Sequence, residues 1–376
     1  MDGAWTSTKP MPRVTFGIIV LNGEPFTRYC LRAIYPFAHE IIVVEGGHED
    51  TRAVATPDGH SVDGTLDTIR RFCAEEDPEH KVTLVTTEGF WPKKDELGND
   101  RTAQSRAYAE RTTGDYLWQV DIDEFYLPGD IRRVLEMLAA DPDISGASFR
   151  QITYWGSPAI IVHSWRVRRG LDSVHRLFRW GPGYRYVTHE PPTVVDASGN
   201  DLRKMKWIGA ADLERQDIYL YHYSLLFPWQ VEQKALIYKH EKPDNFGEII
   251  EWGETCYFRL GRPYRVHNLY QWPSWLERYE GEHPTEVVRM MDDITAGRVE
   301  AVLRDNDDAE RLLDTWWYRL GAIGLSYADY LDRAGLRVLR VLYRAYRAPK
   351  AIMRRLRVKR AKDSSEERDS AISPRP

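Results

Sequence analysis

Residues 115–125 read Asp115-Tyr116-Leu117-Trp118-Gln119-Val120-Asp121-Ile122-Asp123-Glu124-Phe125. The aromatic and β-branched residues of 116–120 favour a buried strand. Asp121 and Asp123 follow two residues apart, and side chains at this spacing on an extended backbone point to the same side. Two carboxylates so placed repel each other unless a cation lies between them. The stretch therefore predicts a Mg²⁺ or Mn²⁺ site at a strand end, the alternative being a solvated acidic turn.

Similar apolar runs precede this stretch. Buried strands are predicted at 14–21, 40–44 and 81–86, and helices at 26–35, 61–76 and 101–111. Strands alternating with helices over 13–127 specify a mostly parallel sheet with right-handed crossovers. In such sheets ligands collect at the carboxyl ends of the strands, which is where Asp121 and Asp123 fall.

The second half of the chain has a mixed pattern. Strands are predicted at 146–153, 173–180 and 217–223, and helices at 131–140, 229–240, 275–303 and 311–331. The expected fold class is α/β: a mostly parallel sheet flanked by helices, a mixed α+β second half and a helical C-terminal extension. The expected divisions are a catalytic domain at 13–265, with halves 13–127 and 128–265, then a helical extension at 266–331. A basic amphipathic helix at 332–362 and a disordered tail at 363–376 are expected to follow.

Composition points to a soluble globular protein, with 42% hydrophobic and 29% charged residues among 376. The three cysteines, Cys30, Cys73 and Cys256, have neither metal-site spacing nor a disulfide framework, which favours a reducing compartment. Residues 1–12 lack an apolar signal core, and no run approaches the roughly 18 apolar residues of a membrane span. A cytoplasmic location is therefore expected.

Charge is distributed unevenly along the chain. Residues 333–362 contain twelve Lys or Arg and no Asp or Glu, so a chain of net charge -5 carries -17 elsewhere. The acidic body argues against nucleic acid as a partner. In the basic segment, Arg333, Arg337, Arg340 and Arg344 form one helical stripe, and leucines and tyrosines largely form another. Such a helix is expected to contact the anionic inner face of a membrane, or else to pack on the acidic body.

The first half resembles the GT-A nucleotide-sugar transferases, in particular the inverting glycosyltransferase family 2. Four motifs carry the resemblance: Leu21-Asn22-Gly23-Glu24, like the family's Asn-x-Glu turn; acidic Glu45 at a strand end; Ser61-Val62-Asp63-Gly64-Thr65, like its Ser-x-Asp-Gly-Thr helix start; and Asp121-Ile122-Asp123-Glu124, like its Asp-x-Asp motif. The second half is similar to bacterial members through Thr188-His189-Glu190-Pro191 and Tyr221-His222-Tyr223-Ser224.

The resemblance implies sugar transfer from a nucleotide-diphosphate donor to a hydroxyl of a glycan or lipid-linked acceptor, in cell-surface glycan or polysaccharide synthesis. A divalent cation, Mn²⁺ or Mg²⁺, stabilises the charge that develops on the leaving diphosphate. By resemblance, Asp123 is the direct metal ligand, and Asp121 holds the ribose or the metal through water. His222 is a later metal ligand or phosphate contact, the alternative being a buried, hydrogen-bonded histidine.

Inversion requires a general base that takes the proton of the acceptor hydroxyl. The resemblance implies a carboxylate in the second half, and Glu190 is predicted, with His189 beside it as a ligand or an orienting group. Asp172, Asp196 and Asp217 remain alternatives.

The donor pocket is expected to be shaped by four side chains, namely Asn22, Glu24, Glu45 and Asp63. Asp63 has an alternative role as a helix cap. Either Arg101 or Arg106 is expected to pair with the diphosphate, unless both lie on a solvated helix face. The sequence departs from the family pattern in its long loop at 46–62, which is expected to alter the nucleotide pocket or to close over it.

Two other functions compete with glycosyl transfer. A sugar-nucleotide nucleotidyltransferase also uses an α/β sheet and paired aspartates, but usually has a basic, Gly-rich first loop, whereas residues 21–25 contain one Gly and no base. A non-catalytic sugar-binding protein on the same fold is the other alternative, and the presence of both Asp121 and Asp123 argues against it.

Overall fold

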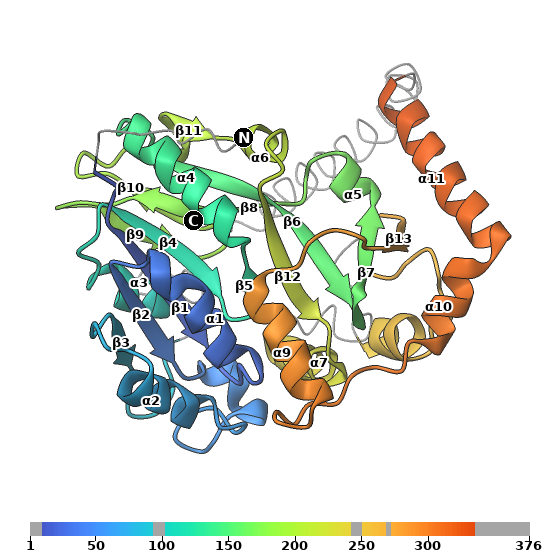
Figure 1. Cartoon of the computed structure of the whole chain (residues 1–376), viewed down its shortest axis with the longest axis horizontal. Helices are drawn as coiled ribbons and strands as arrows, with labels where there is room; N and C mark the ends of the chain where they lie inside the picture. The colour runs from blue at the N-terminus through green and yellow to red at the C-terminus, as the bar shows by residue number, and fades with distance from the viewer. Residues whose placement is uncertain (1–9, 93–101, 242–249, 268–271, 335–376) are drawn as a thin grey trace, which may run out of the picture. The chain divides into compact units, whose positions relative to one another are not determined.

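The computed structural model describes residues 10–92, 102–241, 250–267 and 272–334 (Figure 1). Its strands are β1 (Val14–Val20), β2 (Glu40–Glu45), β3 (Val82–Val85), β4 (Tyr116–Asp121), β5 (Glu124–Phe125), β6 (Gly146–Trp155), β7 (Ser157–Ser164), β8 (Ser173–Arg179), β9 (Arg185–Thr188), β10 (Thr193–Val195), β11 (Trp207–Ile208), β12 (Tyr219–Leu225) and β13 (Ser274–Arg278).

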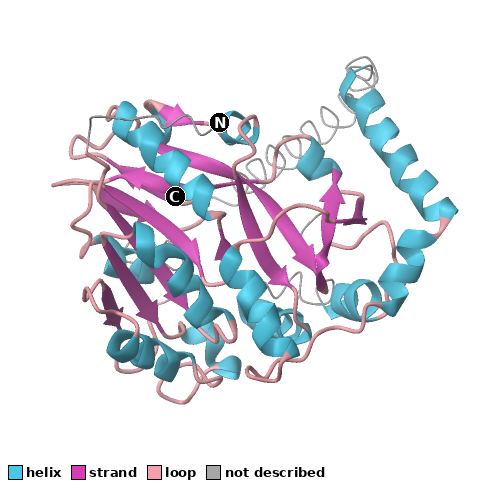
Figure 2. Cartoon of the chain, viewed as in Figure 1, coloured by secondary structure: helices cyan, strands magenta, loops and turns pink. Residues whose placement is uncertain are grey.

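Helices alternate with the strands in the first half and cluster near the end of the chain (Figure 2). They are α1 (Phe26–Ile34), α2 (Thr65–Glu75), α3 (Thr102–Ala109), α4 (Pro128–Ala140), α5 (Trp165–Arg168), α6 (Ala210–Glu214), α7 (Pro228–Glu241), α9 (Thr285–Thr295), α10 (Asp307–Asp314) and α11 (Trp316–Ala334). The short helical turns are η1 (Tyr35–Phe37), η2 (Glu49–Val54), η3 (Leu202–Lys204) and η5 (Gly253–Phe258).

One large mixed sheet holds most of these strands, in the order β13-β7-β6-β8-β4-β1-β2-β3. The pairs β3–β2, β2–β1 and β1–β4 are parallel, and the pairs from β4 through β8, β6 and β7 to β13 are antiparallel. The expected α/β class is therefore confirmed: a parallel first half flanked by helices, a mixed second half and helices at the C-terminal end of the described residues.

Both faces of the parallel strands are covered. In β2, Ile41 and Val43 belong to one apolar cluster, which includes residues of α1 and α4, while Ile42 and Val44 belong to a second, which includes α3. This alternation follows from the two-residue period of a strand. Both faces of β2 are therefore apolar, as its uninterrupted apolar sequence predicts.

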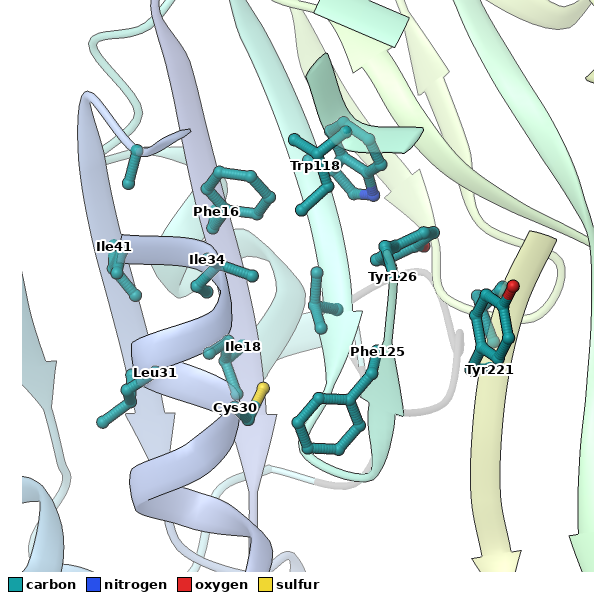
Figure 3. Packing of buried hydrophobic residues seen from close by; sticks show 14 of the residues in the cluster. Phe16, Ile18, Cys30, Leu31, Ile34, Ile41, Trp118, Phe125, Tyr126 and Tyr221 are labelled. Carbon is teal, nitrogen blue, oxygen red and sulfur yellow. The ribbon is translucent and has the colours of Figure 1, made fainter. Parts of the chain in front are cut away.

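Trp118 of β4 is a fully buried member of the first cluster (Figure 3). Its ring stacks between Phe16 and Phe149, with centroid separations of 5.5 Å and 5.4 Å, and Tyr126 meets it edge-on at 5.0 Å. Offset stacking and edge contacts of this kind add stability beyond the buried area. The segment that carries the acidic cluster is thus anchored by the most aromatic part of the core.

The sequence predictions for the first half hold to within a few residues, but one helix in the second half is wrong. Residues 274–278 form strand β13, paired with β7, and only Thr285–Thr295 of the predicted 275–303 helix is helical. The structural reason is the break at Gly281 and Pro284 and the turn at Gly297, which has a φ of 68°. Strand β7, which alternates buried Ile160 and Val162 with less buried residues, was not predicted.

The predicted 311–331 helix is split at Thr315 into α10 and α11. The described residues fall into two compact units that divide after Asp314, and the expected domain divisions stay predictions. The basic helix expected at 332–362 and the tail at 363–376 lie almost entirely outside the described residues. No helix among the described residues is long and apolar enough to cross a membrane.

We expect Gly17→Ala in β1 to lower the free energy of unfolding by about 1–3 kcal/mol, as overpacking of a core does. A methyl group there would lie 2.6 Å from Cδ2 of Tyr108, whose ring is fully buried and cannot move aside. The matched control is Gly129→Ala in α4, where a Cβ meets no atom within 4 Å. Urea unfolding measures both variants, and equal stability of the two would contradict this packing.

Candidate functional site

The strand order reverses between β1 and β4. After β1 the chain adds β2 and β3 on one side, and then returns to add β4 on the other. Ligands of α/β sheets bind at such reversal points, outside the carboxyl ends of the strands. The turn after β1 meets the loop after β4 here, because a Cβ on Gly23 would lie 3.0 Å from Cγ1 of Ile122. The structure thus brings the Asn22–Glu24 turn beside Asp121 and Asp123.

Asp121 is held by a buried arginine from the antiparallel half of the sheet. Nη2 of Arg176, on β8, donates to both Asp121 and Glu124. The other oxygen of Glu124 accepts from the backbone N–H of Asp121 at 3.1 Å. Burial opposes the charge of Arg176, but Asp121 and Glu124 raise the pKa of its guanidinium well above its usual value. Arg176 therefore stays charged and fixes the end of β4.

Asp123 faces a histidine from a different strand. Strand β12 pairs with β5 in antiparallel register, which places Nε2 of His222 3.5 Å from Oδ1 of Asp123. Nε2 of Gln230 donates to the other carboxylate oxygen at 3.3 Å. Burial would raise the pKa of Asp123, but His222 and then Lys234 lower it below its usual value. Asp123 is therefore an ionised, oriented carboxylate.

A second cation lies near this pair. Lys234 of α7 donates to the backbone oxygen of Ser224 at 2.9 Å, and burial lowers its pKa while Asp123 and Asp121 oppose that shift. Burial and then the charges of Lys234 and His222 lower the pKa of His267 to about 3. His267 is therefore neutral at pH 7. Asp123 raises the pKa of His222 against the opposing effect of burial.

Three residues of this cluster were not predicted from the sequence, namely Arg176, Gln230 and Lys234. A signal existed for two of them, because Gln230 and Lys234 lie four residues apart on the predicted 229–240 helix and so share one face. The sequence gives no comparable signal for Arg176, which reaches the site only through strand pairing.

Two residues of this site, Asp123 and His222, could hold a divalent cation. The described residues contain no group of three or more His, Cys, Asp or Glu that could hold a metal ion. Asp123 and His222 nevertheless present a carboxylate oxygen and an imidazole nitrogen toward each other. Mg²⁺ commonly takes only one or two protein carboxylates and completes its shell with phosphate and water oxygens. Asp121, by contrast, is occupied by Arg176.

Asn22 and Asp63 tie the loop at 46–62 to the turn after β1. The amide of Asn22 donates to the backbone oxygen of Val54 at 2.6 Å and accepts from the N–H of Val62 at 2.8 Å. Asp63 accepts from the N–H groups of Glu24 at 2.9 Å and Thr65 at 3.1 Å. Both side chains thus have structural partners, and their contact with a donor stays a prediction.

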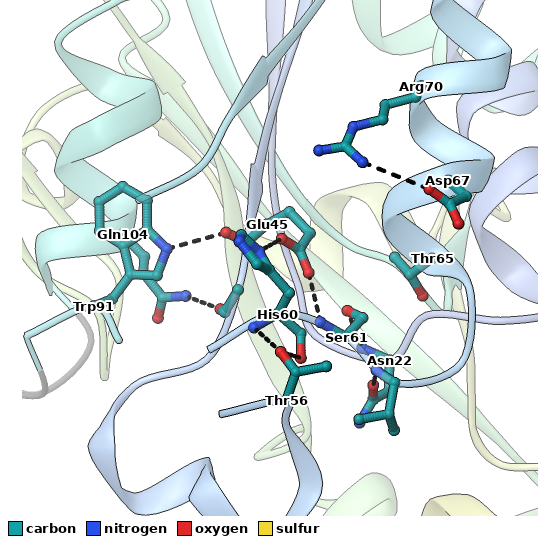
Figure 4. Close-up of polar contacts among 12 residues, drawn as sticks. Asn22, Glu45, Thr56, His60, Ser61, Thr65, Asp67, Arg70, Trp91 and Gln104 are labelled. Carbon is teal, nitrogen blue, oxygen red and sulfur yellow. Dashed lines mark hydrogen bonds and ion pairs between the residues drawn. The ribbon is translucent and has the colours of Figure 1, made fainter. Parts of the chain in front are cut away.

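Glu45 lies underneath the same loop (Figure 4). Its side chain is completely buried, and its oxygens bond Nδ1 of His60 at 2.7 Å and the N–H of Ser61 at 2.8 Å. Nε1 of Trp91 donates to its backbone oxygen at 3.1 Å. The long loop thus covers the end of β2 and leaves both oxygens of Glu45 engaged within the protein. Its effect on a nucleotide pocket stays a prediction.

His189 and Glu190 lie in the loop that joins β9 and β10. Nδ1 of His189 is 2.9 Å from Oγ of Ser105 on α3, and Tyr186 of β9 donates to Gln119 of β4 at 2.6 Å. These bonds fix the hairpin against α3 and β4, while Glu190 is exposed.

The three carboxylates that are alternatives to Glu190 as the general base lie in different surroundings. Asp196 accepts bonds within its own turn, from Ser198 and Asn200. Asp172 is largely buried and lies 3.8 Å from Arg166, whereas Asp217 is exposed in a turn before β12. Arg101, expected to contact the diphosphate, lies outside the described residues.

A cavity of about 740 Å³ opens between the turn after β1, η2, α7 and residues 300–302. Carboxylates of Glu24, Asp63, Glu232 and Glu300 line it together with Trp229 and aliphatic side chains, and no Lys or Arg is among the described lining residues. Its size is that of a small-molecule site. The charge of its lining suits a neutral part of a ligand rather than a phosphate.

Comparison with known proteins gives only weak structural similarity over part of the chain. No protein-family model and no curated protein matches the sequence. Among solved structures, the chain is similar to S. aureus TarS, with a TM-score of 0.26 and 11% identity over 39% of this chain and 21% of that one. It is also similar to Mycobacterium tuberculosis glucosyl-3-phosphoglycerate synthase in complex with Mn²⁺, UDP and glucosyl-3-phosphoglycerate, with a TM-score of 0.26 and 16% identity over 39% and 45%.

A third structure, S. aureus TarS 1–349 in complex with UDP-GlcNAc, matches with a TM-score of 0.24 and 13% identity over 38% of this chain and 34% of that one. The chain thus spans less than half the length of each of these proteins. With similarity at this level, function has to be inferred from the site itself.

We expect Arg176→Met to destabilise the fold by about 3–5 kcal/mol, because it leaves the buried carboxylate of Glu124 without its cation. Adding Glu124→Gln should recover part of the loss, since the buried charge is then removed. The control is Arg215→Met, which breaks an exposed ion pair with Asp212 and should cost less than about 1 kcal/mol. Thermal unfolding of the wild type, the two single variants and the double variant measures these losses of stability. Equal losses for Arg176→Met and Arg215→Met would contradict the buried pairing.

Proposed function

We propose that the chain is an inverting glycosyltransferase that moves a sugar from a nucleotide-diphosphate donor to a hydroxyl acceptor. The observation that carries the proposal is the Asp123–His222 pair, 3.5 Å apart at the carboxyl end of β4, beside the reversal point of the sheet. Ligands of α/β sheets bind at that place. The order of the sequence motifs, which resembles family 2, supports the same activity.

The diphosphate of the donor would be bound by a divalent cation, held by Asp123 and His222, and by Lys234. A Mn²⁺ or Mg²⁺ held by Asp123 and His222 would act as a Lewis acid toward the leaving diphosphate. Gln230 holds the second oxygen of Asp123, so the carboxylate keeps one orientation. The buried ammonium of Lys234 offers a further positive charge for the same phosphates, and a charge in a water-excluded site is worth more than in solvent.

The nucleoside of the donor would occupy the 740 Å³ cavity. A base and a ribose are neutral, as the lining of that cavity requires, and ribose hydroxyls can donate to the carboxylates of Glu24 and Asp63. The indole of Trp229 offers an apolar surface for the base. Helix α7 contributes Trp229 to this cavity and Gln230 to the bond with Asp123, so one helix serves both parts of the proposed donor site.

Glu190 is the proposed base. It is exposed on a short loop, so an acceptor arriving from solvent can reach it, and the adjacent His189 is held by Ser105. Asp196 is committed to its own turn and Asp172 is paired with Arg166, which leaves Asp217 as the remaining exposed alternative. The proposed acceptor is a hydroxyl of a glycan or lipid-linked intermediate in cell-surface glycan synthesis.

In the presence of Mn²⁺, we expect at least one nucleoside diphosphate to raise the melting temperature of the wild-type protein. A ligand at about 100 times its Kd adds about 2.7 kcal/mol to the stability. Asp123→Asn should abolish this shift while the variant without ligand stays folded. The control Asp67→Asn alters an exposed carboxylate in the first turn of α2 and should leave the shift unchanged. A shift that EDTA does not alter would show that no metal is needed.

For turnover, we expect Glu190→Gln to reduce the rate by about 100-fold or more, because the amide keeps the shape of the side chain and removes its basicity. Donor affinity should change little. Asp217→Asn is the comparison, and a loss of turnover there instead would assign the base to Asp217. Product analysis by NMR tests the stereochemistry, and retention of the anomeric configuration would rule out an inverting mechanism.

A further inference from the structure

Helix α11 presents a continuous apolar stripe to solvent. Its members are exposed by 43% to 72% and comprise Trp316, Leu320, Ile323, Tyr327, Tyr330 and Leu331. At 3.6 residues per turn, or about 100° per residue, the six fall within an arc of about 100°. A contiguous exposed apolar surface of this kind marks an interaction site, whereas single exposed apolar residues do not.

The opposite side of the helix has a different character. Tyr318 is buried there, and the covered carboxylate of Asp329 lies 3.0 Å from Nη2 of Arg333. The small, half-buried residues Gly321, Ala322 and Ala328 also lie away from the stripe. Helix α11 is therefore amphipathic, because its large exposed apolar side chains are gathered on one face.

The composition of the stripe suits a lipid–water interface. Trp and Tyr carry an apolar ring and one polar group, and they are enriched where one end of a side chain is in hydrocarbon and the other is wet. Half of the stripe consists of these two residue types, the rest is Leu and Ile, and it contains no charged residue.

The sequence that follows the stripe supplies a second signal for membrane attachment, namely a basic segment. Residues 333–362 carry twelve Lys or Arg and no Asp or Glu. Stable membrane attachment usually needs two signals, for which an apolar insertion and a polybasic segment suffice. A second copy of this chain would instead bring a second segment of charge +12, so self-association through the stripe gains nothing from this charge.

We propose that α11 lies in the interface of an anionic membrane, with the stripe among the acyl chains. The proposal extends the expected membrane contact from the basic segment to a helix that the sequence predicts only as part of a plain 311–331 helix. It holds whether or not the chain transfers a sugar, because the stripe shares no residue with the proposed site.

The test uses the full chain and vesicles of phosphatidylcholine with or without phosphatidylglycerol. Wild-type protein should sediment with the anionic vesicles, and 1 M salt should release only part of it, because salt screens the charges and leaves the apolar contact. The triple variant Leu320→Gln/Ile323→Gln/Tyr327→Gln should bind at least tenfold more weakly. Its control, Leu171→Gln/Met205→Gln/Val288→Gln, removes three exposed apolar side chains elsewhere and should bind like wild type.

Two further measurements distinguish a membrane from a second copy of the chain as the partner of the stripe. Lipids brominated on their acyl chains should quench tryptophan fluorescence of the wild type, and Trp316→Phe/Trp317→Phe should lose most of that quenching. Light scattering without lipid should give the same mass for the wild type and the stripe variant. Equal vesicle affinity of these two proteins, no binding by the wild type, or a wild-type dimer that the stripe variant abolishes would each overturn the proposal.

Discussion

The guanidinium of Arg176 forms ion pairs with two carboxylates, that of Asp121 at the end of β4 and that of Glu124 in β5. A carboxylate as fully enclosed as that of Glu124 would be costly without this partner. Because Arg176 comes from β8, the ion pairs join the parallel half of the sheet to the antiparallel half. The geometry of the candidate site depends on this bond, since it fixes the last residue of β4 and hence the direction of the loop that carries Asp123.

The parallel half was predictable because its rules are local. Apolar runs such as 14–20 and 40–45 are buried on both faces, and their lengths, turns and intervening helices follow from the sequence. The antiparallel half depends on pairings between distant segments. Residues 274–278 became a strand because β7 offers them a free edge, and nothing in their own sequence separates that outcome from a short helix. The breaks at Gly281 and Pro284 were visible signals that the predicted helix passed over.

The residues of the candidate site also fall into those that the sequence predicts and those that it does not. Asp121 and Asp123 were placed correctly at the end of a strand, since their position follows from the strand that precedes them. Their partners Arg176, His222 and Lys234 come from 55 to 111 residues further along the chain, and only His222 was suggested by resemblance. For Glu45, the sequence left open whether the long loop changes or covers the pocket, because the bonds from His60 and Ser61 depend on how that loop folds back.

Each of the two aspartates has a basic partner within the protein. Asp121 is the last residue of β4 and bonds Arg176, whereas Asp123 lies in the following turn and faces His222. The metal that the sequence predicts for the two aspartates stays a prediction. A divalent ion that binds between Asp123 and His222 must take the place of the proton that Asp123 favours on that histidine. The site is therefore ordered before any ligand arrives, which lowers the entropic cost of binding a donor there.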